Sequence, residues 1–110
     1  MRTQASKIAT EALAAVRPHV EKGLEDLAEF RFAWADLEAD TAATLERSVL
    51  STDAKERREL AEDLERYLPA RRAALVSIVA TRAGSTAHAA FSAALDVAIK
   101  VVVGVAKVLV

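Results

Sequence analysis

The side chains of this 110-residue chain that could do chemistry are scattered and form no recognisable catalytic motif. Its two histidines, His19 and His88, lie far apart, and there is no cysteine to serve as a nucleophile or metal ligand. The glycines at positions 23, 84 and 104 are isolated, so no glycine-rich phosphate loop is present in the sequence. We therefore expect no catalytic residues, no bound metal and no cofactor.

Two groups of charged residues remain as candidates for binding. Glu21, Glu25 and Glu29 are four residues apart and share one helical face, which is usually a solvated face. Arg71 and Arg72 follow Pro69 and lack the interleaved glutamates that accompany the earlier arginines. Our candidate contacts for a partner are these two arginines and one aromatic residue that lies off the apolar pattern: Phe32, Arg71 and Arg72.

The composition is that of a folding, helical chain. Hydrophobic residues make up 53% and charged residues 28%, with only three glycines and two prolines. A net charge of −1 argues against a nucleic-acid partner. The frequent alanine and arginine are typical of proteins from GC-rich bacteria or phages.

Charge is unevenly distributed along the chain. Residues 1–68 carry 10 basic and 15 acidic side chains, whereas residues 69–110 carry 5 basic and 1 acidic. This asymmetry either guides association or reflects an acidic solvated surface followed by a buried segment. The N-terminus lacks the apolar core of a signal peptide, so we expect a cytoplasmic or particle-associated protein.

Apolar residues at helical spacing predict a first amphipathic helix within residues 1–17, which Pro18 ends or kinks. A second helix is predicted from about residue 19 to residue 50. The apolar stripe of the first consists of Ala5, Ile8, Ala9, Ala12, Leu13 and Val16, and that of the second of Val20, Leu27, Phe30, Trp34, Leu37, Leu45 and Val49.

A third helix is predicted over residues 54–83. Asp53 with Glu56 three residues later resembles a capping box, and Pro69 should kink or divide the helix. Its buried face consists of Leu60, Leu64, Leu68, Leu75 and Val79.

Residues 1–110 should form one all-α domain like a four-helix bundle. The similar lengths of the second and third helices predict an acidic antiparallel hairpin over residues 19–83. Gly84 is a natural helix terminator, and Ser85 or Thr86 would cap an apolar C-terminal helix over residues 86–110.

The C-terminal segment is almost wholly apolar. On a helix, its polar residues form one narrow stripe: His88, Ser92, Asp96 and Lys100. We expect another row to contact a second copy or lipid: Phe91, Leu95, Ala98, Val102, Val105 and Leu109. Because valine favours β-strands, the many valines make a strand an alternative for residues 101–110.

The expected free energy of inserting this segment into a membrane is close to zero. A helix of about 24 residues is about 36 Å long, against a hydrocarbon core of about 30 Å. Its large apolar residues contribute about −3 to −7 kcal/mol, whereas Asp96 and Lys100 together cost about 5 to 7 kcal/mol. A single membrane-spanning helix is therefore not favoured, whereas a membrane-spanning helix within an oligomer remains an alternative.

Three functional interpretations remain. The first is a non-catalytic assembly protein that forms a homo-oligomer through its C-terminal helix. The second is a membrane-active protein, either a pore-former like a holin or a membrane-anchored protein, that inserts residues 87–110 as an oligomer. The third is a small binding module or inhibitor that uses the acidic hairpin. None of them involves nucleic acid or a small-molecule substrate.

Overall fold

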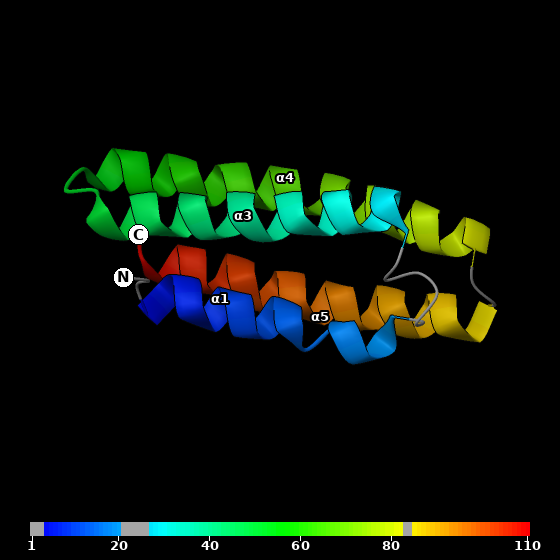
Figure 1. The fold of residues 1–110 in the computed structure, drawn as a ribbon. Helices are drawn as coiled ribbons and strands as arrows, with labels where there is room; N and C mark the ends of the chain where they lie inside the picture. The colour runs from blue at the N-terminus through cyan, green and yellow to red at the C-terminus, as the bar shows by residue number, and fades with distance from the viewer. Residues whose placement is uncertain (1–3, 21–26, 83–84) are drawn as a thin grey trace.

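The computed structural model describes residues 4–20, 27–82 and 85–110, and it confirms the all-α bundle (Figure 1). Its elements are α1 (Gln4–Ala14), the 3-10 helix η1 (Arg17–His19), α3 (Ala28–Leu50), α4 (Ala54–Arg82) and α5 (Ser85–Val108). The described residues include no strand, and α5 continues as helix through residues 101–108. The strand alternative for the C-terminal segment is therefore excluded.

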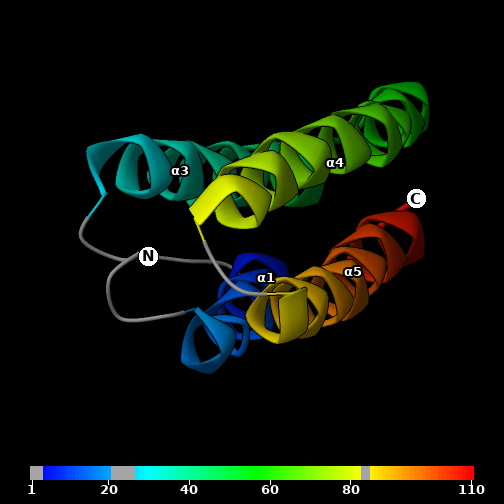
Figure 2. The same cartoon turned by 90° about the vertical axis from the view of Figure 1, so that its right-hand side faces the viewer.

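The helices form two layers in a bundle with principal extents of 46 × 25 × 19 Å. The antiparallel hairpin of α3 and α4 is one layer, and α1 with α5 is the other (Figure 2). Each of the four long helices packs mainly on two neighbours. Both α3 and α5 pack on α1 and α4. Since the chain reverses direction at each step, the start of α1 and the end of α5 lie at the same end (Figure 1).

The first two predicted helices differ from the structure near Pro18. α1 ends at Ala14, and Pro18 occupies the first turn of η1, where its missing N–H costs nothing. A single helix starting at about residue 19 is wrong, because Val20 is extended and α3 begins only at Ala28, after the extended Leu27.

The α3–α4 turn confirms the predicted cap. The Asp53 side chain accepts a hydrogen bond from the backbone N–H of Lys55 at 2.9 Å, and Ser51 Oγ accepts one from the Asp53 N–H at 3.2 Å. Glu56 does not complete a capping box but lies 3.8 Å from Arg47. Pro69 is exposed within α4 and does not divide it. The predicted Gly84 terminator lies outside the described residues.

The core runs the length of the bundle. Phe30 and Trp34 stack with ring centroids 6.1 Å apart, and Phe30 meets Phe91 of α5 edge-on at 5.9 Å. The predicted buried face of α4 is confirmed throughout, whereas on α3 Val49 is exposed and Thr41 and Ser48 occupy inner positions. Polar residues at inner positions escape a search for apolar spacing.

Candidate functional site

The predicted polar stripe of α5 packs against α4. Arg72 of α4 donates a hydrogen bond to the backbone oxygen of Ser92 at 3.4 Å, and its Nε lies 3.9 Å from Asp96. Lys100 lies 3.1 Å from Asp96, one turn away, and Lys107 pairs with Glu65 of α4. His88 is half-buried near the start of the same stripe. The contacts of Arg72 and Lys107 join α4 and α5 along their shared edge, whereas the Asp96–Lys100 pair lies within α5.

The row expected to meet a second copy or lipid lies against the interior of the single chain. Phe91, Leu95, Ala98 and Val102 are buried in the bundle core. Val105 and Leu109 are partly buried and pack against that core. Contact of this row with another molecule would require α5 to leave the bundle.

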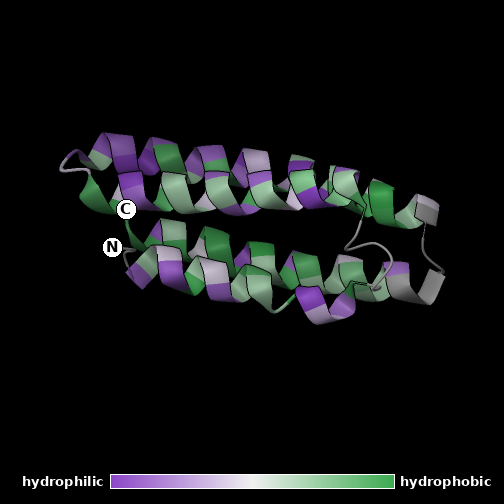
Figure 3. Ribbon diagram, viewed as in Figure 1, coloured by the Kyte–Doolittle hydropathy of each residue, from purple (hydrophilic) through white to green (hydrophobic). Residues whose placement is uncertain are grey.

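A different side of α5 faces outward, and we call it the outer face: Val97, Val101, Gly104 and Val108 of α5 with Ile8 of α1. Val97 is 62% exposed and Val108 is 85% exposed. Between the two helices lies a shallow apolar groove of about 560 Å³, lined by Gln4, Ala5, Ile8, Val101, Gly104, Val105, Val108 and Leu109. The sequence could not separate this side from the buried one, because both are apolar (Figure 3).

Charged residues flank the outer face on both helices: Lys100 and Lys107 on α5, and Lys7 and Glu11 on α1. Lys107 lies on the side toward α4, where it pairs with Glu65, and Lys100 lies two turns before it on the same side of α5. Glu11 is exposed and lies about one turn beyond Ile8 and two turns beyond Gln4 on the same side of α1. Since the groove pairs residues 4–8 with residues 101–109 of an antiparallel helix, Glu11 lies near the level of Lys100.

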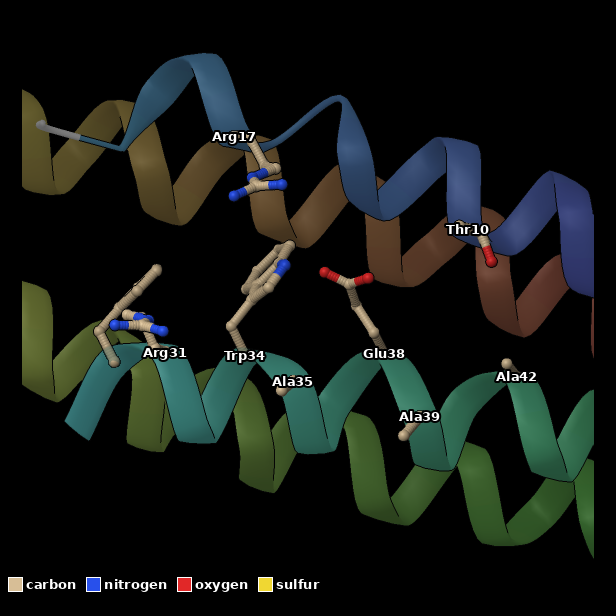
Figure 4. A pocket seen from close by; sticks show the side chains of 9 residues that line it. Thr10, Arg17, Arg31, Trp34, Ala35, Glu38, Ala39 and Ala42 are labelled. Carbon is tan, nitrogen blue, oxygen red and sulfur yellow. The ribbon is translucent and has the colours of Figure 1, made fainter. Parts of the chain in front are cut away.

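A second hollow, which we call the α1–α3 cleft, lies between the two layers (Figure 4). Its volume is about 430 Å³, and it is lined by Thr10, Arg17, Phe30, Arg31, Trp34, Ala35, Glu38, Ala39 and Ala42. The prediction that Phe30 and Trp34 are core residues is confirmed. Apolar spacing does not predict that Arg17 lines this cleft together with Arg31, because Arg17 precedes Pro18 in a separate element.

The three predicted partner contacts lie in different settings. Phe32 projects from α3 and is 72% exposed, as its position off the apolar stripe indicates. Arg71 lies over the ring of Tyr67, 5.1 Å from its centroid. Arg72 is engaged with α5. The structure therefore does not bring the three together, and of the three only Phe32 is exposed, whereas Arg71 and Arg72 are half-buried.

The carboxylates and histidines form no metal site in the part of the chain that the structure describes, where no cluster of three such ligands occurs. Glu29 and His19 are exposed. Glu21 and Glu25 of the predicted acidic row lie outside the described residues.

By length and composition alone, residues 88–108 of α5 could cross a membrane, although 33% of the apolar window is buried in the bundle. In comparisons with known proteins, no family model, no curated sequence and no solved structure matches this chain.

Proposed function

We propose that this protein is a non-catalytic assembly module that binds a second copy of itself through the outer face. The observation that carries the proposal is the row of exposed valines on α5, continued by Ile8 of α1. In water, an apolar strip of this length favours association, because burying it removes hydrocarbon surface from solvent.

One pair of charges beside the outer face, Glu11 and Lys100, suits a second copy. If the two-fold axis runs parallel to the helices, the α1 side of one copy meets the α4 side of the other. Glu11 then lies opposite Lys100 of the second copy, and the symmetry forms this pair twice. An antiparallel pairing would instead place α1 against α1 and would not bring Glu11 opposite Lys100.

The size of the strip indicates weak association. The exposed Ala90 and Ala93 continue the outer face toward the start of α5. From Ala90 to Val108 the helix is about 28 Å long, and one helix with part of the next is about 15 Å wide, which gives about 400 Å² per copy. A total of about 800 Å² is at the low end for specific complexes. We therefore expect a dissociation constant between about 10 µM and 1 mM.

Sedimentation velocity from about 10 to 500 µM protein tests the proposal. The mass of the natural chain should rise with concentration, and Val97→Glu should remain monomeric, because a carboxylate in the interface loses its hydration. Leu50→Glu is the matched control: Leu50 is 77% exposed but lies at the end of α3, away from the outer face. A natural chain that stays monomeric throughout would refute self-association.

Membrane association is the second candidate, favoured by the length and apolar composition of α5. Insertion would remove Phe91 and Leu95 from the core and separate Asp96 from Arg72. Flotation with vesicles of neutral and anionic lipid distinguishes the two candidates. Binding to vesicles by a chain that is monomeric in water would favour the membrane function.

A further inference from the structure

The α1–α3 cleft exists because α3 presents small side chains there. Ala35, Ala39 and Ala42 follow one another at helical spacing and leave the gap between α1 and α3 unfilled (Figure 4). A volume of about 430 Å³ lies within the range of small-molecule sites. The row of methyl groups and the rings of Phe30 and Trp34 make much of this wall apolar.

Two cations stand at this apolar wall. Arg17 comes from η1 and Arg31 from α3, and Figure 4 shows Arg17 reaching toward the Trp34 ring from the opposite layer. The structure gives neither guanidinium a hydrogen bond or ion pair with any other residue that it describes. Unpaired guanidiniums are well suited to carboxylates, which they bind through two parallel N–H donors.

A buried donor lies between these groups. Trp34 is 7% exposed, and its indole Nε1 has no hydrogen-bond partner among the described residues. Figure 4 shows this nitrogen on the ring edge that faces Glu38, whose carboxylate stands beside it. A buried N–H without a partner is unfavourable. A hydrogen-bond acceptor that enters the cleft therefore binds more tightly if it reaches Nε1. Nε1 is shielded from solvent, and Figure 4 shows the half-buried Glu38 beside it, so we expect the Glu38 side chain to turn aside before an acceptor reaches Nε1.

We propose that the α1–α3 cleft binds a small organic carboxylate with an apolar body. The carboxylate is held by Arg17 and Arg31 and accepts a hydrogen bond from Trp34 Nε1, and the body lies on the alanine row. Two arginines against the single carboxylate of Glu38 leave the cleft positive, which selects an anion over a neutral analogue. This site departs from the sequence-based expectation of no small-molecule ligand.

Trp34 makes the site directly observable, because it is the only tryptophan of the chain. A ¹H–¹⁵N correlation spectrum therefore contains one indole cross-peak. Titration with benzoate should move this peak downfield and saturate in the millimolar range, as suits a ligand of this size. Benzyl alcohol, which has the ring without the charge, should move it little. The Val97→Glu background keeps self-association out of the measurement.

Variants identify the groups that hold the anion. Arg17→Gln and Arg31→Gln should each weaken benzoate binding about tenfold, since each removes a charged donor. Arg58→Gln, an exposed arginine of α4, should leave binding unchanged. Glu38→Gln should tighten binding by removing a like charge. Absence of a saturable indole shift would overturn the proposal, as would a shift that both cleft arginine variants leave unchanged or that benzyl alcohol reproduces.

Discussion

Tyr67 links α4 to α3 through a single side chain. Its hydroxyl donates a hydrogen bond to Oδ2 of Asp40 at 2.7 Å, and Arg71 lies over its ring. Burial, followed by the hydrogen bond and charge of Asp40, raises the pKa of Tyr67 from 10.0 to about 12, and Arg71 opposes the shift. The phenol thus keeps its proton, and its bond to α3, well above pH 10.

We predict that Asp40→Asn lowers the pKa of Tyr67 from about 12 toward 10.0 without reaching it, because burial is the largest cause and remains. Tyr67 is the only tyrosine, so a titration of phenolate absorbance reports it alone. Glu29→Gln, which removes an exposed carboxylate at the start of α3, is the control and should not move the pKa. An unchanged pKa in Asp40→Asn would show that the interhelical hydrogen bond does not form.

The raised pKa of Tyr67 also determines the direction in which the stability of the fold changes with pH. Because the folded-state pKa lies above the unfolded value of 10.0, the contribution of Tyr67 is complete below pH 10 and is lost as the pH rises through about 12. Urea unfolding at about pH 9 and pH 11.5 should therefore show a steeper loss of free energy in the natural chain than in Tyr67→Phe.

At the scale of elements, α5 has three distinct sides. One is buried in the core, one pairs with Arg72 and Glu65 of α4, and one is the outer face. Burial of a large apolar side chain contributes about 1.5 to 3 kcal/mol. The buried side therefore attaches α5 to the bundle, while the exposed valines add little to folding of one chain.

We predict that Leu95→Ala lowers the free energy of unfolding by about 2 to 5 kcal/mol, because it leaves a cavity in the core. Val97→Ala should change it by less than about 0.5 kcal/mol in the monomer. Urea unfolding followed by circular dichroism checks both. The cost of Leu95→Ala should be the same at low and high protein concentration, whereas a residue that contacts only a second copy would show a concentration-dependent cost.

At the scale of the whole molecule, α1 brings Lys7 and Glu11 to the outer face, and α5 brings Lys100 and Lys107. The proposed two-fold arrangement pairs Glu11 with Lys100 twice. Exposed ion pairs contribute about 0.2 to 1 kcal/mol each, so they select the arrangement while the valines supply most of the affinity.

A charge exchange tests this arrangement. Glu11→Lys and Lys100→Glu should each weaken self-association about three- to tenfold, since each replaces two attractions by two repulsions. The double variant should restore the affinity of the natural chain. Sedimentation at low salt measures the three variants, and 0.5 M salt should reduce the differences between them. A double variant weaker than either single one would exclude the parallel two-fold pairing.

Periodicity by itself determined most of the helical framework. On α4, Leu60, Leu64 and Leu68 are separated by charged residues, so only one side can be buried, and the structure confirms it. Asp53 fixed the start of α4 because a helix needs an acceptor for its first N–H groups. The start of α3 was misplaced, since apolar spacing through Leu27 does not report the extended residues that precede it.

Only the tertiary structure decided which side of α5 is buried. Val97 and Val102 are equally apolar in sequence, yet one is exposed and the other is fully buried. The α1–α3 cleft is likewise a tertiary feature, because Arg17 and Trp34 belong to separate elements that meet across the two layers. Local spacing assigns a residue to a side of its helix, but packing between helices determines which sides meet and what space remains between them.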